Sequence, residues 1–229
     1  MTGFFITGTD TEIGKTTITA GLAHALGQRG LTVAALKPIS AGLDFIGGHW
    51  VNDDVERLRA AGNLGLTSAD VGALQLQTAC APHIAARIEH QQIARKPLLH
   101  AVRSMAARAQ MTLVEGVGGF RVPLTDDWDT ADLAVDLGLP VILVVGLRLG
   151  CINHALLTAE AVRARGLRLA AWVANTVDPD LPHVADNLRA LQAGLGAPCL
   201  GHVPRLSTAH HSVVAGHLNI APLLQAPCA

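Results

Sequence analysis

Aromatic residues are scarce in this chain of 229 residues, in which tyrosine is absent and aromatic side chains make up 3% of the total. A surface that stacks nucleobases on aromatic rings is therefore not expected. Basic residues are not in excess either, because 17 lysines and arginines are balanced by 18 aspartates and glutamates. Without a basic surface, the sequence predicts no nucleic-acid partner and no membrane partner.

Cysteine is sparse, and no two cysteines form a Cys-x-x-Cys pair. The four are Cys80, Cys151, Cys199 and Cys228. Isolated thiols of this kind are typical of small buried side chains in a reducing compartment. Cys80 with His83, and the pair His210 and His211, come nearest to the spacing of zinc ligands, but neither has partners downstream. We therefore expect no Cys/His metal site.

Long hydrophobic runs are also missing. The most apolar segment, residues 139–150, is too short to span a bilayer and contains Arg148. The first ten residues have no basic stretch followed by a long apolar run, so they do not resemble a signal peptide. The expectation is a cytoplasmic protein.

Hydrophobic residues, by contrast, are abundant at 50% of the chain, enough for the core of one α/β domain over residues 1–229. Short apolar or β-branched runs recur, and they are nearly continuous rather than alternating. Such runs are typical of strands buried on both faces. The predicted strands are residues 3–7, 31–36, 111–115, 140–145, 169–175 and 198–204.

Helical spacing occurs between several of these runs. Residues 15–30 and 153–166 show it, and each segment ends in a glycine, Gly30 or Gly166. The alternation of strands and helices predicts an α/β fold with a parallel sheet flanked by helices. The arrangement of residues 53–110 is left unassigned. Ligands of such sheets bind beyond the carboxyl ends of the strands, so polar residues that follow the strands are the candidate site.

The stretch GTDTEIGKT, residues 8–16, follows the first predicted strand and precedes a helical pattern. It resembles a phosphate-binding loop, but five residues rather than four separate Gly8 from Gly14. Backbone N–H groups of such a loop and of the next helix can surround a polyphosphate. Lys15 would then reach the terminal phosphates, and the Thr16 hydroxyl would bind Mg²⁺. This context favours nucleotide binding over an ordinary glycine-rich turn.

Carboxylates at two further places could serve the metal or cap a helix. Glu115 ends the strand MTLVE and is followed by GVGG, a flexible loop that lets backbone approach a phosphate. A carboxylate there can bind Mg²⁺. Asp53 and Asp54 fit a helix N-cap pair, and for Asp53 this is the favoured interpretation.

Lys37 ends the second predicted strand and is held extended by Pro38. A solvated surface lysine is the ordinary alternative. Because this lysine lies at the same sheet edge as the phosphate loop, the pattern instead favours a second cation over the reacting phosphoryl group or its acceptor.

Eight motifs together resemble those of the dethiobiotin synthetase family: GTDTEIGKT, LKPISAG, NDD, APHIAA, VEGVGG, GCINHA, VAN and VPRL. They run in order from residue 3 to about residue 206. The resemblance implies a phosphate-loop NTPase fold and a carbon–nitrogen cyclo-ligase. In this reaction 7,8-diaminopelargonate, CO₂ and ATP give dethiobiotin, ADP and phosphate. A carbamate on one amine would take the γ-phosphoryl group as a mixed anhydride, and the second amine would close the cyclic urea.

The resemblance also implies roles for individual residues. Lys15, Lys37 and Thr11 would be catalytic, with the two lysines stabilising negative charge on phosphate and carbamate. Thr16, Asp54 and Glu115 would bind Mg²⁺ as well as the nucleotide. Asn175 and residues 204–206 would border adenine. The full set of further nucleotide contacts would be Glu12, Ile13, Gly14, Thr17, Gly116, Val117, Gly118, Asn175, Thr176, Pro204, Arg205 and Leu206.

On the substrate side, we hypothesise that the extra loop residue lets Thr11 and Glu12 face the diamine as well as the nucleotide. The resemblance implies a homodimer in which one chain's helix end holds the carboxylate of the diamine in its neighbour's site; a capped helix start is the ordinary alternative. The family generally has a hydroxyl residue where this chain has Ala41. The implied substrate contacts are Thr11, Lys37, Ser40, Ala41, Gly150, Cys151, Ile152 and Asn153.

Three other classes share parts of this pattern. Regulatory ATPase switches of the partitioning or septum-positioning type carry an additional lysine early in the loop, which residues 9–11 lack. Cobyrinic acid synthases need a downstream glutaminase domain, and only about twenty residues follow the last motif here. A guanine-nucleotide switch is the weakest of the three, since Asn175 and Thr176 are not directly followed by an aspartate. The ATPase switch is the main rival.

Overall fold

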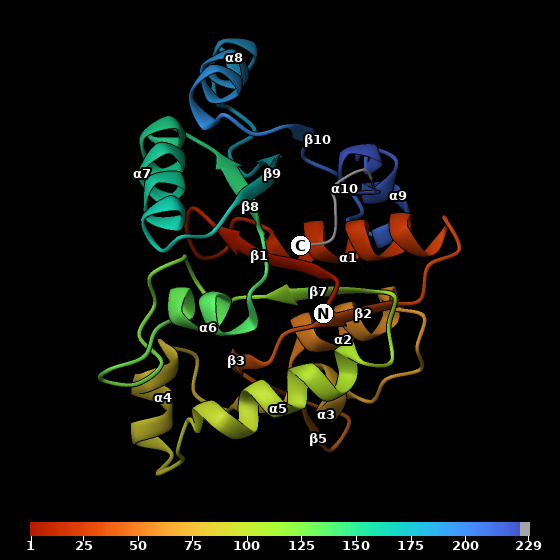
Figure 1. The fold of residues 1–229 in the computed structure, drawn as a ribbon, viewed down its shortest axis with the longest axis vertical. Helices are drawn as coiled ribbons and strands as arrows, with labels where there is room; N and C mark the ends of the chain where they lie inside the picture. The colour runs from red at the N-terminus through yellow and green to blue at the C-terminus, as the bar shows by residue number, and fades with distance from the viewer. Residues whose placement is uncertain (225–229) are drawn as a thin grey trace.

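The computed structural model describes residues 1–224, and Figure 1 shows six parallel strands at its centre. Their order across the sheet is β10-β9-β8-β1-β7-β2. All six predicted strands are present with small shifts of their ends, which confirms the expected α/β class. They are β1 Gly3–Gly8, β2 Val33–Leu36, β7 Met111–Glu115, β8 Val141–Leu147, β9 Leu169–Thr176 and β10 Cys199–Val203.

Helices cover both faces of this sheet. The right-handed crossovers of parallel sheets put α5, α6, α7 and α8 on one face and α1 on the other. Contacts of α7 with α8, of α5 with α6, and of α1 with α9 agree with that division. The helices are α1 Lys15–Gly27, α2 Asp53–Ala61, α3 Ser68–Val71, α4 Pro82–Ile88, α5 Arg95–Ala106, α6 Thr130–Leu137, α7 Cys151–Ala164, α8 Val184–Leu195, α9 His211–Ala215 and α10 Ala221–Leu224.

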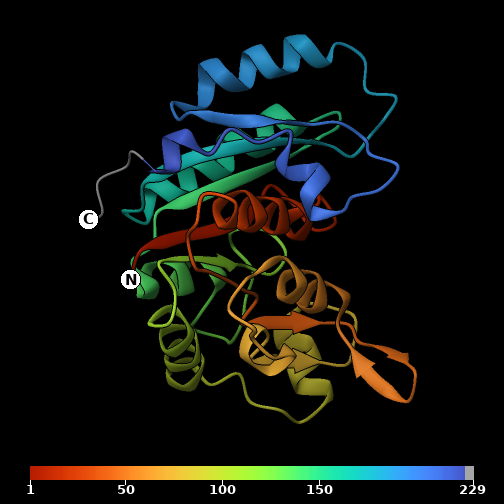
Figure 2. The same cartoon turned by 90° about the vertical axis from the view of Figure 1, so that its right-hand side faces the viewer.

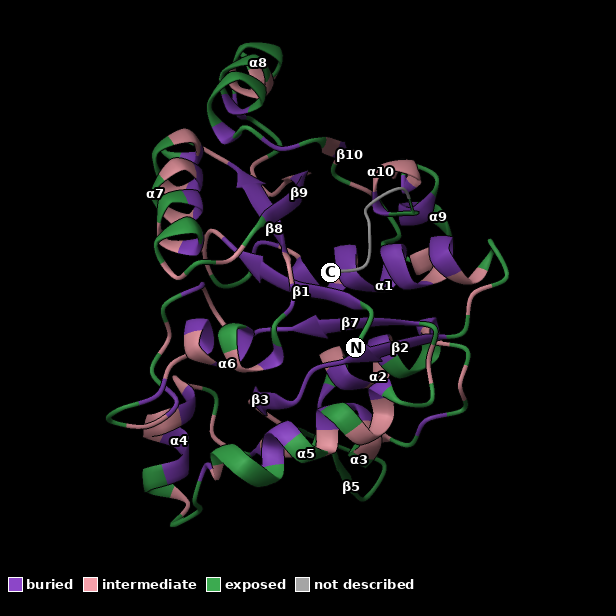
Figure 3. Ribbon diagram, in the orientation of Figure 1, coloured by how far each residue is buried: buried purple, intermediate pink, exposed green. Residues whose placement is uncertain are grey.

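The central strands are buried along their whole length, as their continuous apolar sequences predicted. Every residue of β1 and of β8 is buried (Figure 3). Phe5 and Trp172 are among the largest fully buried side chains, and the Trp172 indole N–H donates to the Ala197 carbonyl at 3.1 Å. A core of this kind holds the strand ends, and hence the residues that follow them, in fixed relative positions.

The two helices that the sequence predicted begin or end a few residues away from their predicted limits. Helix α1 ends at Gly27, three residues before Gly30. Helix α7 begins at Cys151 rather than at Asn153, with Gly150 as its N-cap. Gly166 follows its C-cap with a φ of 73°, a conformation that glycine adopts without steric cost.

Small β-structures and short helices form the region that the sequence left unassigned. Strand β3 (Ile39–Ala41) pairs in parallel with β6 (Leu74–Leu76). Strands β4 (Asp44–Ile46) and β5 (His49–Val51) form an antiparallel hairpin that projects from the body of the protein in Figure 2. The rings of Phe45 and Trp50 contact each other on this hairpin.

Three cysteines within the described residues, Cys80, Cys151 and Cys199, are free thiols, as predicted. Cys228 lies outside the described residues. Among residues 1–224, no helix combines the length and apolar character needed to cross a membrane.

Candidate functional site

Strand register brings three sequence motifs together at the carboxyl edge of the sheet. Ile6 of β1 pairs with Glu115 of β7, and Leu36 of β2 pairs with Val114 of the same strand. The phosphate loop, Lys37 and Glu115 therefore lie at the carboxyl ends of three neighbouring strands, at the same height along the sheet. The sheet edge predicted to bind ligands is the edge on which these residues meet.

The phosphate loop is fixed at its base by buried contacts. Gly14 is the N-cap of α1 with a φ of 85°, and a Cβ there would lie 2.3 Å from Asn175 Nδ2. Ile13 is buried between two glycines, because a Cβ on Gly8 or on Gly146 would approach its side chain to 2.8 or 2.6 Å. The Asn175 amide donates to the Ile13 carbonyl at 2.9 Å. Strands β8 and β9 thus set the position of the loop.

Lys15 folds back over this loop. Its ammonium donates to the Asp10 carbonyl at 2.8 Å. Burial lowers the pKa of Lys15 to about 8, against the opposing effect of the negative charge of Glu115. The lysine is therefore a buried cation directed at the loop interior.

Lys37 lies between two carboxylates. Its Nζ is 2.9 Å from Glu115 Oε1 and also donates to Asp54 Oδ2. Burial by itself would lower the pKa of Lys37, but the charges of Glu115 and Asp54 outweigh it and raise the pKa. Burial would likewise raise the pKa of Asp54, but Lys37 and the Thr16 hydroxyl lower it. A solvated surface lysine is thus the wrong description of Lys37.

Oxygen ligands gather beside the start of α1. The Thr16 hydroxyl donates to Glu115 Oε1 at 2.7 Å. Glu115 Oε2 is buried and has no hydrogen-bond partner among residues 1–224. A buried carboxylate oxygen without a donor is costly unless a ligand or an ion satisfies it.

The N-cap of α2 is Asn52, and the N-cap interpretation of Asp53 is wrong. Asn52 has extended backbone angles, and its side chain accepts from the Val55 N–H at 3.1 Å. Asp53 and Asp54 are the first two residues of the helix itself. The Asp53 side chain is 76% exposed, whereas Asp54 turns toward Lys37.

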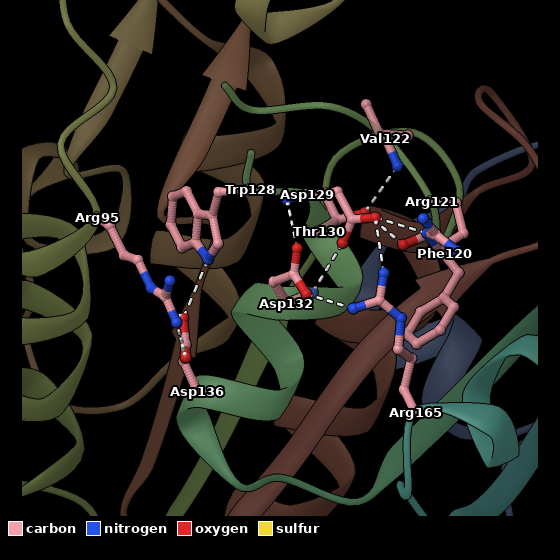
Figure 4. Close-up of polar contacts among 10 residues, drawn as sticks. All are labelled: Arg95, Phe120, Arg121, Val122, Trp128, Asp129, Thr130, Asp132, Asp136 and Arg165. Carbon is pink, nitrogen blue, oxygen red and sulfur yellow. Dashed lines mark hydrogen bonds and ion pairs between the residues drawn. The ribbon is translucent and has the colours of Figure 1, made fainter. Parts of the chain in front are cut away.

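The start of α6 holds residues 120–122, which follow the glycine-rich segment after Glu115 (Figure 4). Thr130 Oγ1 donates to the Phe120 carbonyl at 2.5 Å and accepts from the Val122 N–H at 3.1 Å. Asp129 caps the helix, and it also pairs with Arg121 at 2.5 Å and with Arg165 at 3.3 Å. These contacts fix the chain that leads out of residues 116–118.

Ser40 and Ala41 lie on strand β3, where successive side chains point to opposite faces. The Ser40 hydroxyl is buried without a hydrogen-bond partner in the described part of the chain, and Ala41 is partly exposed. Ser40 therefore cannot supply a hydroxyl on the face that Ala41 presents.

The remaining predicted residues also follow strands at this edge. Asn175 and Thr176 end β9, residues 204–206 follow β10, and Gly150 to Asn153 begin α7 after β8. Among the described residues, no side chain caps α7, so no side-chain acceptor serves its first-turn N–H groups, which as in any helix lack intrahelical acceptors. Cys151 is buried and directs its Sγ to Asn187 Oδ1 at 3.7 Å.

Three charged residues at the site were not singled out from the sequence. Asp10 pairs with Arg148 across the edge of the sheet. Arg57 of α2 donates to the Thr17 hydroxyl at 2.8 Å. Asp10 lies within the phosphate loop, and Arg148 directly follows a predicted strand. These locations were the available signal for a role in the site, but neither residue belongs to a periodic pattern.

The comparisons with known proteins agree with this geometry. The model of an AAA domain family matches residues 2–211. The ATP-dependent dethiobiotin synthetase of Ralstonia nicotianae is 50% identical over 220 residues, which cover 96% of this chain and 96% of the relative. That of Pseudomonas paraeruginosa is 51% identical over 224 residues, or 97% of this chain and 98% of the relative.

Solved structures of a MinD protein and of a ParA family ATPase resemble this chain in fold alone. The septum site-determining protein MinD of Pyrococcus horikoshii, complexed with Mg-ADP, is 18% identical, with a TM-score of 0.54 over 98% of this chain and 90% of that one. A ParA family ATPase of Chlorobium tepidum is 14% identical, with a TM-score of 0.54 over 100% of this chain and 94% of that one. The dethiobiotin synthetases, by contrast, are about half identical to this chain over nearly its full length. The chain belongs to the dethiobiotin synthetase family.

Proposed function

We propose that the chain catalyses the ATP-dependent closure of the cyclic urea of dethiobiotin from 7,8-diaminopelargonate and CO₂, with release of ADP and phosphate. The observation that carries this function is the buried position of Lys37 beside Glu115, at the mouth of a phosphate loop, in a member of this family. A phosphate loop alone would fit many ATPases. A second buried cation at its mouth supports transfer of the phosphoryl group to an anionic acceptor.

The nucleotide occupies the loop and the start of α1. Backbone N–H groups of residues 12–17 and the Lys15 ammonium bind its phosphates, and residues 116–118 lie along the other side. Asn175 and Thr176, with residues 204–206, border adenine. Because the Asn175 N–H groups face the Ile13 carbonyl, the amide oxygen is the atom suited to accept from the amino group of adenine.

The residues beside Thr16 fit Mg²⁺. The Thr16 hydroxyl, Asp54 and Glu115 would supply the hard oxygen ligands that this ion prefers, and the buried Glu115 Oε2 has no hydrogen-bond partner within the described residues. When bound, Mg²⁺ would neutralise charge on the phosphates of the nucleotide.

Lys37 serves the acceptor. One amine of the diamine adds to CO₂ and loses a proton, which gives a carbamate. A carbamate oxygen attacks the γ-phosphorus as ADP leaves, and the second amine then attacks the carbonyl carbon and expels phosphate. Lys37 and Lys15 lie on either side of the transferred group, where they stabilise the negative charge of carbamate and phosphoryl oxygens.

The diamine lies against Thr11, Lys37 and the face of β3 that carries Ala41. Its carboxylate is bound by the N-terminus of α7 (residues 150–153) of a second copy, a helix start that no side chain of the described residues caps. Each site of the homodimer is then shared between chains. The exposure of Leu149 at 91%, directly before this helix, supports a covered position in the dimer.

A single reaction tests the proposed function. The protein is incubated with diaminopelargonate, bicarbonate and Mg-ATP, and products are identified by mass. We expect dethiobiotin and phosphate in equal amounts. Phosphate release without cyclic urea would support the ATPase switch instead.

A further inference from the structure

The tip of the phosphate loop, Thr11 and Glu12, is held by different contacts from its base, Ile13 and Gly14. Ile13 and Gly14 are tied to the sheet by buried packing and by the Asn175 amide. Thr11 and Glu12, by contrast, are exposed. Glu12 has a φ of 54°, a left-handed conformation that is strained for a residue other than glycine. Strain of this kind persists only where neighbouring contacts hold the backbone in place.

Asp10 supplies such contacts on the side of the tip that faces β8. One oxygen of its carboxylate, Oδ1, accepts from the Thr11 N–H at 2.8 Å. The other, Oδ2, pairs with the guanidinium of Arg148, which directly follows β8. The Asp10 carbonyl accepts from the Lys15 ammonium at 2.8 Å. Asp10 thus joins the tip of the loop, the buried lysine and the sheet edge.

We propose that Arg148 is a positioning residue, which holds Thr11 and Glu12 in place for the diamine by pairing with Asp10. The inference rests on the proposed function, in which Thr11 faces the diamine. It adds that the two halves of the loop are fixed by different contacts. The base is fixed by the packing of Ile13 and by the Asn175 amide, and the tip, which faces the diamine, is fixed by the Asp10–Arg148 pair.

The Asp10–Arg148 pair is partly exposed, so its role in positioning the loop tip can be tested separately from any contribution to the stability of the fold. The side chains of Arg148 and Asp10 are 42% and 43% exposed. Ion pairs this accessible are screened by solvent and contribute little to the stability of the fold. Their loss should therefore change the position of the loop tip while thermal stability stays close to that of the wild type.

The experiment compares Arg148→Ala, Arg148→Lys and Asp10→Asn with the wild type. Asn at position 10 keeps an oxygen that can accept from the Thr11 N–H, so this variant removes the charge and the acceptor that faces Arg148 and retains the contact with Thr11. Arg189→Ala is the matched control, because Arg189 forms a similar exposed pair with Asp186 on α8. The measurements are the thermal midpoint, the Kd for ADP without diamine, and kcat and KM for each substrate.

We expect Arg148→Ala and Asp10→Asn each to raise KM for the diamine by about fivefold, the upper range for an exposed charge pair. The Kd for ADP should change by less than about twofold, and Arg148→Lys should restore most of the diamine KM. The double variant should match the single variants, because both changes break one pair. Equal changes in diamine KM and ADP Kd, an unchanged diamine KM, or multiplying effects in the double variant would overturn the proposal.

Amide hydrogen exchange of residues 9–13 separates this inference from the proposed function, because it needs no turnover. Faster exchange in Arg148→Ala than in the wild type and in Arg189→Ala is the expected result. If the wild type forms no dethiobiotin but exchange rises in this way, the proposed function fails and the role of Arg148 in holding the tip stands. If exchange is unchanged, the role of Arg148 is wrong whatever the reaction.

Discussion

Lys37 Nζ lies 2.9 Å from Glu115 Oε1, and both side chains are almost fully buried, at 7% and 0% exposure. An ion pair in such surroundings is held by its own attraction, since little water screens it. Removing one member leaves the other as an uncompensated buried charge, which is strongly destabilising. The pair therefore links catalysis to the stability of the site.

Lys37→Met should abolish turnover while ADP still binds. A cation that stabilises developing charge contributes on the order of a hundredfold or more to kcat, whereas the nucleotide is held mainly by the loop. The ligand-free variant should also unfold more easily by about 3 kcal/mol, because Glu115 loses its partner. kcat, ADP Kd and denaturant unfolding measure the three effects.

Mg-ADP should raise the thermal midpoint of Lys37→Met by more than that of the wild type, since the cation replaces a missing positive charge beside Glu115. If Lys37→Met has a normal kcat, the role of Lys37 is purely structural.

Glu115→Gln and Asp54→Asn should each shift the Mg²⁺ dependence of ADP binding to higher metal concentration. Each change removes a charged oxygen ligand from beside Thr16. Calorimetric titration of ADP at a series of Mg²⁺ concentrations measures the shift without turnover.

Asp53→Asn is the control for this metal titration, because Asp53 is the neighbouring carboxylate on α2 but faces solvent. If Asp54→Asn and Asp53→Asn give the same curve as the wild type, Asp54 is not a metal ligand.

Ala41→Ser should lower KM for the diamine by about fivefold. A new hydrogen bond between a hydroxyl and the substrate typically contributes roughly 1 kcal/mol to binding. The face of β3 at position 41 carries only a methyl group here, and Ser40 points to the other face. Steady-state kinetics at saturating ATP measure the change.

Ser40→Ala is the matched control and should leave the diamine KM unchanged. Its hydroxyl has no partner in the described structure, so its removal should not destabilise the fold either. A raised KM in Ser40→Ala would mean that Ser40 reaches the substrate after all.

The sheet could be predicted from sequence because its strands are buried on both faces, which leaves a continuous apolar signature in each. The same logic located Lys37 and Glu115, since residues that follow parallel strands must meet at one edge. The family expected from the motifs is confirmed by relatives near 50% identity. The functional roles of the individual site residues remain predictions.

The details that sequence did not predict depend on contacts between distant or irregular segments. Asp10 and Arg148 are 138 residues apart, and single charges in loops have no periodicity from which a pairing could be inferred. The strands β3 to β6 have three residues each, too short for a pattern. Asn52 and Asp53 are both good N-caps, and only backbone angles separate them.

The last prediction tests whether each active site is shared between two chains. Lys37→Ala and Asn153→Asp are purified separately, and each is expected to be inactive as a pure dimer. Asp at position 153 places a negative charge at the helix end that is proposed to bind the carboxylate of the diamine, and the residue is exposed, so the fold should tolerate it. The two proteins are then refolded together, and dethiobiotin formation is measured at equal total subunit concentration.

Random pairing makes about half of the dimers mixed. If α7 of one chain completes the site of the other, a mixed dimer has both lesions in one site and none in the second. Activity should then return to about a quarter of the wild-type value. Mixing each variant with the wild type, and mass spectrometry of intact dimers, control for pairing. Should the mixture stay inactive although mixed dimers form, each chain uses its own helix end and the shared site is wrong.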